Sequence, residues 1–177
     1  MSASAAERYA AQRHVISTTT PAGNTVVERV TLGIARELPE VSVHFSRTPV
    51  FGSSDPSPDR YASEGLLAAA RLLAHAAPGV IVWNGSKGAG IGFEHDRALV
   101  ASITAETGIR ATTSILGMAS LLAARSIRRI GIVTPYSDES QRKTRDCLAR
   151  EGYDCVAHAF AGLSDNLSYA SVPRERI

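Results

Sequence analysis

The residues best suited to chemistry in this sequence are small polar side chains in three turns. The turns are "TPAGNT" at 20–25, "NGSKGAG" at 84–90 and "TPYSDE" at 134–139, and a helix-like segment follows each one. The first turns of helices have unpaired N–H groups, and the helix dipole there favours negative charge. If the three turns share one edge of a parallel sheet, they predict a site for an anion, most simply a carboxylate.

Several side chains in or near these turns could donate hydrogen bonds to such an anion. The candidates are Asn24, Thr25, Ser86 and Tyr136, and Arg47 could add a cation for bidentate binding of a carboxylate. Each candidate also has a purely structural interpretation. Asn24 is suited to cap a helix and Ser86 to support its own turn. Tyr136 could be a half-buried aromatic residue, and Arg47 a solvated residue at a strand end.

The glycines near residue 88 do not form a nucleotide-binding motif. Gly88, Gly90 and Gly92 read GxGxG rather than GxGxxG, and they follow the third predicted strand rather than the first. Lys87 precedes Gly88, so the order of a phosphate-binding P-loop is absent from the sequence. We therefore expect no nucleotide cofactor.

The cysteines and histidines do not indicate a metal site or a reactive thiol. Cys147 falls within a predicted helix and Cys155 within a predicted strand, whereas a reactive thiolate needs a helix N-terminus or a cationic neighbour. The five histidines are scattered without the spacing of metal ligands: His14, His44, His75, His95 and His158. We expect neither a metal nor another cofactor.

Composition narrows the classes of partner. The sequence has 177 residues and a formal net charge of +2, and its basic residues form no long run, so we expect no nucleic-acid partner. No apolar stretch approaches the length of a membrane span, and the polar start of the chain lacks the apolar core of a signal peptide. The expectation is a cytoplasmic protein with a flexible N-terminal arm at 1–13.

Hydrophobic periodicity places the turns in an alternating order of strands and helices. Strands are predicted at 14–20, 41–46, 80–83, 109–113 and 153–160, and 128–136 is predicted to be a strand followed by a turn. Helices are predicted at 25–38, 60–77, 94–107, 114–126 and 138–152. Ser114 is the expected N-cap of its helix. The first helix is predicted to place five apolar residues on one face, namely Val26, Val27, Val30, Ile34 and Leu38. This alternation predicts an α/β fold with a parallel sheet covered by helices on both faces.

Five segments resemble the aspartate/glutamate racemase superfamily, particularly maleate cis–trans isomerases and arylmalonate decarboxylases. They are "TPAGNT", "NGSKGAG", "ATTS" at 111–114, "RRIGIVTPYSDE" at 128–139 and "LSDNLSYASV" at 163–172. The resemblance covers about residues 14–177. It implies flavodoxin-like lobes that face each other across a cleft, with a small dicarboxylate bound there and no cofactor.

The resemblance also implies roles for individual residues. Asn24, Ser86, Tyr136 and Asn166 match substrate-binding positions, and Thr25 and Gly85 lie beside them. Thr112 and Thr113 match the family's "TTS" turn more loosely.

The catalytic cysteines of the family have no counterpart here. Asn84 stands where family members with a first-lobe cysteine carry it, and the position of the second cysteine lies beyond Ile177. An amide donates hydrogen bonds but neither shuttles protons nor acts as a nucleophile at neutral pH. His95 is a candidate for the acid or base by residue type, although an exposed residue in the first turn of a helix is its simpler interpretation.

These expectations combine into a domain and function hypothesis. Residues 14–126 are expected to form a first α/β lobe, and 127–177 the start of an incomplete second lobe whose strands extend the first sheet or pair with another chain. We expect a homo-oligomer or a partner subunit. The expected function is that of an isomerase, racemase or decarboxylase-type protein that binds a small dicarboxylate. Its catalysis is expected to be impaired or to depend on a partner. The alternatives are a non-catalytic small-acid-binding or interaction subunit, and a truncated fragment of an active enzyme.

Overall fold

The structure is a computed structural model that describes residues 14–50, 60–173 and 175. The predicted N-terminal arm at 1–13 lies outside the described residues, as does the segment 51–59 between β2 and α3. None of the helices in the described ranges has the length and apolar character needed to cross a membrane.

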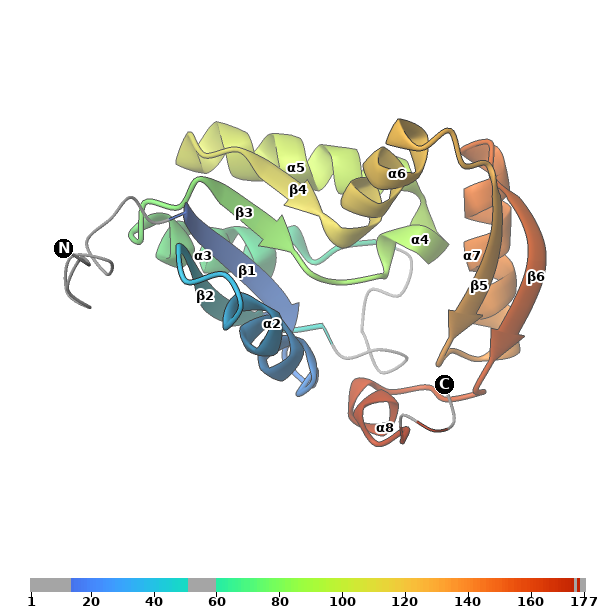
Figure 1. The fold of residues 1–177 in the computed structure, drawn as a ribbon. Coiled ribbons are helices and arrows are strands. Elements are labelled where there is room, and N and C mark those ends of the chain that lie inside the picture. Colours follow the sequence, from blue (N-terminus) through green and yellow to red (C-terminus); the bar gives the residue numbers. More distant parts are fainter. Residues whose placement is uncertain (1–13, 51–59, 174, 176–177) are drawn as a thin grey trace, which may run out of the picture.

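Four parallel strands form the larger sheet, in the order β2-β1-β3-β4 (Figure 1). The strands are β1 (His14–Pro21), β2 (Val41–Thr48), β3 (Val80–Trp83) and β4 (Ala111–Thr113). The helices that connect them are α2 (Val27–Ala35), α3 (Ser63–Ala74), the short α4 (Gly88–Ile91) and α5 (Phe93–Thr107). The predicted α/β fold with a parallel sheet is confirmed.

The strand order explains where a ligand site can form. The chain moves from β1 outward to β2, then returns past β1 to β3 and continues to β4. Because crossovers between parallel strands are right-handed, this reversal places α2 on the opposite face of the sheet from α3 and α5 (Figure 1). Ligands of open α/β sheets bind at the carboxyl ends of the strands where the direction reverses, which here is between β1 and β3.

One face of this sheet carries the main hydrophobic core. Ile81 and Trp83 of β3 are fully buried there against Leu66 of α3 and against Leu99 and Ile103 of α5. Burial of such side chains contributes about 1.5–3 kcal/mol each to folding.

The opposite face is much less covered. The helix predicted at 25–38 ends at Ala35 and has no fully buried residue, because it packs mainly over the edge strand β2. Val30, Ile34 and Leu38 of its predicted apolar face are exposed. This apolar face is therefore largely uncovered in the chain as described.

The last third of the chain builds a second, separate sheet. It contains β5 (Arg129–Thr134), β6 (Asp154–Phe160), α6 (Ser114–Ala124) leading in, α7 (Asp138–Arg150) between the strands and the short α8 (Asn166–Ala170). Strands β5 and β6 are parallel and pair only with each other. Of the two alternatives for these strands, extension of the first sheet was wrong, and pairing with another chain stays a prediction.

The two sheets are joined through helices. Helix α4, which the sequence presented only as a glycine-rich turn, packs against α7. Ala89 and Phe93 form a second core with Ile115, Leu148 and Tyr153. Further apolar side chains of this second sheet are exposed, namely Val133, Val156 and Phe160.

Candidate functional site

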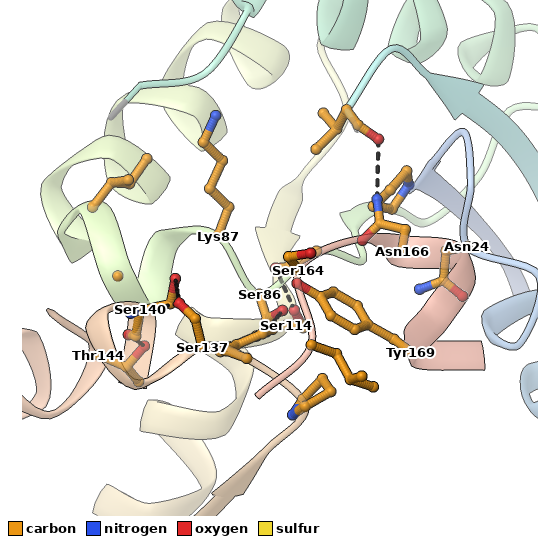
Figure 2. Close-up of a pocket in the computed structure, with 18 of the residues that line it drawn as sticks. Asn24, Ser86, Lys87, Ser114, Ser137, Ser140, Thr144, Ser164, Asn166 and Tyr169 are labelled. Carbon is orange, nitrogen blue, oxygen red and sulfur yellow. Dashed lines mark hydrogen bonds between the residues drawn. The ribbon is translucent and has the colours of Figure 1, made fainter. Parts of the chain in front are cut away.

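A pocket of about 470 Å³ lies where the carboxyl ends of both sheets face each other (Figure 2). Loops after β1, β3, β4, β5 and β6 all contribute to it. Its polar lining residues carry amides, hydroxyls and two ammonium groups: Asn24, Asn84, Ser86, Lys87, Ser114, Tyr136, Ser137, Ser140, Lys143, Thr144, Ser164, Asn166 and Tyr169. No Asp, Glu, His or Cys is found among the described residues of this lining.

Most of the residues predicted for the site meet in this pocket. Those brought together are Asn24, Asn84, Gly85, Ser86, Tyr136 and Asn166. Thr25 is exposed and does not line it. Arg47 does not line it either, because its guanidinium donates to the carbonyl oxygens of Ala22 and Asn24 and pairs with Glu28 at 3.0 Å.

Asn24 lines the pocket and also accepts hydrogen bonds at the start of α2. Its Oδ1 accepts hydrogen bonds from the backbone N–H groups of Val26 and Val27, at 3.0 and 3.1 Å. This is the capping interaction expected before a helix, and it fixes the side chain. With Oδ1 engaged in this way, Nδ2 is the part of the amide suited to donate to an anion.

Ser86, after β3 of the first sheet, and Tyr136, after β5 of the second, form a hydrogen bond between their hydroxyl groups. Burial raises the pKa of Tyr136 above its usual value. The ring of Tyr169 meets that of Tyr136 edge to face at 5.6 Å, and burial followed by the nearby Tyr136 raises the pKa of Tyr169 to about 12. Both phenols therefore stay protonated at neutral pH and can donate hydrogen bonds to a negative ligand.

Asn166 ties the end of the chain to the first lobe. It is the first residue of α8, whose N-cap Asp165 accepts from the N–H groups of Leu167 and Ser168. The Asn166 Nδ2 donates across the pocket to the carbonyl oxygen of Val50, at 3.1 Å (Figure 2). Asn166 thus positions the β6–α8 loop over the loops of the first sheet.

The loop after β3 is held in place by the ring of Trp83 and by a hydrogen bond from Ser114. Gly85 lies against the indole of Trp83, so closely that a side chain at residue 85 would overlap the ring. The Ser114 hydroxyl donates to the carbonyl oxygen of Gly85 at 2.8 Å. The predicted N-cap at Ser114 was wrong: Thr113 caps α6 by accepting from the N–H of Leu116, which leaves Ser114 to support the pocket loop.

A buried carboxyl group lies behind the same loop. Asp96 of α5 is fully buried and receives the hydroxyl of Tyr61 at 3.3 Å. It lies so close to Gly88 that a Cβ at residue 88 would collide with it. Burial raises the pKa of the Asp96 carboxyl, and hydrogen bonds from Thr113 and Tyr61 offset this only in part. The sequence offered no signal for this group beyond an acidic residue in the first turn of a helix.

We predict that replacing Asp96 with asparagine changes the pH dependence of stability. A carboxyl with a raised pKa in the folded state stabilises the fold below its unfolded pKa, and this contribution is lost as the pH rises through the folded pKa. The nearby basic groups of His95 and Arg97 lower the pKa of the Asp96 carboxyl, but burial raises it by more. Urea denaturation should show Asp96→Asn gaining stability relative to the wild type as the pH rises from 4 to 8. A constant difference between the two proteins would contradict this assignment.

The thiols and His95 lie outside the pocket lining. Cys147 is 3% exposed, its Sγ donates to the carbonyl of Gly90, and burial raises its pKa. Burial likewise raises the pKa of Cys155. His95 is partly exposed and faces Glu94 at 4.0 Å. Within the described ranges, no three His, Cys, Asp or Glu side chains are arranged to hold a metal ion.

Sequence reasoning missed the side of the pocket formed by α4 and α7. Ser137, Ser140 and Thr144 line it from one face of α7, and Lys87 and Lys143 accompany them. The spacing of Ser137, Ser140 and Thr144 along the helix was a usable signal, since residues three and four apart share a face. The sequence could not indicate that α7 packs against α4, because more than 45 residues separate the two helices along the chain.

Comparison by sequence gives no relatives. No protein-family model matches the chain, and no curated protein matches it either.

Comparison by structure gives clear relatives. A cysteine-to-serine variant of the Nocardia farcinica maleate cis-trans isomerase, with a covalently bound succinylcysteine intermediate, has a TM-score of 0.79 and 21% identity over 92% of this chain and 69% of its own. The maleate isomerase Iso of Pseudomonas putida has a TM-score of 0.75 and 21% identity, over 91% of this chain and 69% of its own. An unliganded arylmalonate decarboxylase has a TM-score of 0.68 and 21% identity, over 85% of this chain and 63% of its own.

These matches span both sheets of the described chain, so they test its architecture. They agree with the superfamily resemblance that the five sequence segments carried. The chain therefore has the fold of the maleate cis-trans isomerases and arylmalonate decarboxylases.

Proposed function

We propose that this protein binds a small dicarboxylate in the pocket between its two sheets, as an isomerase, racemase or decarboxylase-type protein. The observation that carries the proposal is the lining of the pocket. Amide and hydroxyl donors from five strand-end loops converge there, and the described lining contains no acidic side chain. Preorganised neutral donors of this kind stabilise carboxylates and the enediolate formed when an α-proton or CO₂ leaves.

We further propose that catalysis is impaired or depends on a partner. Proton transfer needs a group that can gain and lose a proton near neutral pH. In the Nocardia relative a cysteine carries the covalent intermediate, whereas the pocket described here is lined by Asn84 after β3 and by no thiol or imidazole. A second copy or a partner subunit would have to supply that group, and the exposed Val133, Val156 and Phe160 support association.

The second candidate is a non-catalytic protein that binds small acids. The same lining favours it, because donors suited to binding are present while the described lining lacks a group for proton transfer.

Deuterium exchange tests the two candidates against each other. Malonate, methylmalonate, maleate and aspartate are incubated with the protein in heavy water, and NMR follows exchange at their α-carbons and maleate isomerisation. We expect wild-type protein to be stabilised against heat by a dicarboxylate. We expect slow or undetectable exchange for the wild type, and faster exchange for Asn84→Cys, because a thiolate at residue 84 can remove the α-proton and return a deuteron.

The outcomes separate the alternatives. Ligand stabilisation without exchange in either protein favours the binding protein. Exchange by the wild type identifies an enzyme whose acid or base lies outside the described lining. If none of the dicarboxylates stabilises the protein against heat, the proposed function is contradicted.

A further inference from the structure

The pocket contains both lysines of the sequence. Lys87 and Lys143 are the only lysines among the 19 Lys and Arg residues, and they lie 56 positions apart. Both line the pocket, whereas none of the described lining residues is an arginine. A protein that uses arginine at every other basic position thus places its two ammonium groups at one site.

The two lysines belong to the same wall. Lys87 leads into α4, and its Nζ donates to the carbonyl oxygen of Arg60 at 2.6 Å. Figure 2 shows Lys87 across the pocket from Asn166. Lys143 is on α7, the helix that packs against α4, and it pairs with Glu139 at 3.2 Å. An ammonium has three N–H donors, so the carbonyl partner of Lys87 leaves that positive charge in place, whereas the charge of Lys143 is shared with the exposed carboxylate of Glu139.

Hydroxyl groups continue this wall along α7. Ser137 caps the helix by accepting from the N–H of Ser140, and its hydroxyl lies 3.2 Å from that of Ser140. Thr144 follows one turn later and also lines the pocket. The α4–α7 wall, defined as Lys87, Ser137, Ser140, Lys143 and Thr144, therefore offers positive charge and hydrogen-bond donors together.

Charge and size point to a ligand longer than a four-carbon diacid. Pockets of about 300–1,000 Å³ hold drug-sized ligands, and this one has about 470 Å³. One carboxylate held by Ser86 and Tyr136 leaves the α4–α7 wall available to a more distant group of the same molecule. Lysine acts there as a compact point charge that suits either a carboxylate or a phosphate.

We propose that the α4–α7 wall is a second anion subsite, and that the natural ligand is an extended acid with negative groups at both ends. This inference rests on the proposed function, because it assumes that one carboxylate binds at the strand-end loops.

The test measures affinity by calorimetry for acids of increasing length. The probes are propanoate, succinate, glutarate and adipate, with 3-phosphonopropanoate to distinguish a phosphonate from a carboxylate at the far end. The variants are Lys87→Gln and Lys143→Gln. Arg110→Gln is the matched control, since it removes the same charge from an exposed residue that precedes β4, at the opposite edge of the sheet.

We expect glutarate or adipate to bind more tightly than succinate. Each lysine variant should weaken the longer diacids by about fivefold, the effect of a partly exposed charge pair, and leave propanoate unchanged. The control should behave as the wild type. If the lysine variants bind every probe as the wild type does, the second subsite is wrong while the proposed function stands. If no probe binds the wild type, both are wrong.

Discussion

Replacing Gly88 with alanine will destabilise the protein by about 3 kcal/mol, at the upper end of the usual range for overpacking. The alanine Cβ would fall on the carboxyl oxygen of Asp96, which is fully buried and held by Tyr61. The carboxyl cannot move away without weakening that hydrogen bond, and Gly88 is itself buried at the start of α4. Urea denaturation measures the effect directly.

Gly117→Ala is the matched control. Gly117 lies inside α6, and a Cβ there would meet no atom within 4 Å. Because glycine lowers helix stability, this substitution should stabilise the protein by about 0.5–1 kcal/mol. Combining Gly88→Ala with Asp96→Ala should recover part of the loss, since the collision is removed. Equal effects of Gly88→Ala and Gly117→Ala would show that Asp96 does not support the loop.

Removing the hydroxyl groups of Ser86 and Tyr136 together will reduce dicarboxylate affinity by up to about 100-fold. Hydrogen bonds to a charged group contribute about 1.5–3 kcal/mol, so each single variant, Ser86→Ala or Tyr136→Phe, should lose about tenfold or more. The two hydroxyls bond each other in the structure, so their effects need not add. Calorimetric titration with malonate or maleate provides the measurement.

Thr25→Val is the control for this series. Thr25 is adjacent to Asn24 but is exposed and does not line the pocket. Loss of its hydroxyl should leave the affinity unchanged. A loss of affinity at Thr25 comparable to that at Ser86 would place the ligand elsewhere.

Local patterns predicted the elements well wherever one signal dominated. The strand predicted at 80–83 and the helix end predicted at 107 have the correct positions. Gly108 after α5 and Gly152 after α7 adopt the left-handed conformation that ends helices. Helix α4 was missed because three glycines in five residues are typical of a turn. Its helical form depends on packing against α7, which no local pattern contains.

The residues of the site were likewise predicted only in part. Asn24 and Ser86 were predicted to meet because strands of one parallel sheet end at the same edge, and they do line one pocket. Tyr136 lines the same pocket, but from the end of β5 in the second sheet, so the predicted reason for its place was wrong. Arg47 and Thr25 are also polar residues near these loops, but they do not line the pocket. The direction of a side chain depends on local pairing, such as that of Arg47 with Glu28, which the residue type alone does not reveal. The separation of β5 and β6 into their own sheet was likewise set by packing between helices, which a sequence pattern does not specify.

The central claim is that a carboxylate binds to neutral donors at the strand-end loops, and a crystal structure with bound malonate tests it most directly. The account predicts that carboxylate oxygens lie within hydrogen-bonding distance of Ser86 Oγ, Tyr136 Oη and Asn24 Nδ2. Malonate bound at another surface, with this pocket empty at concentrations that stabilise the protein, would contradict it.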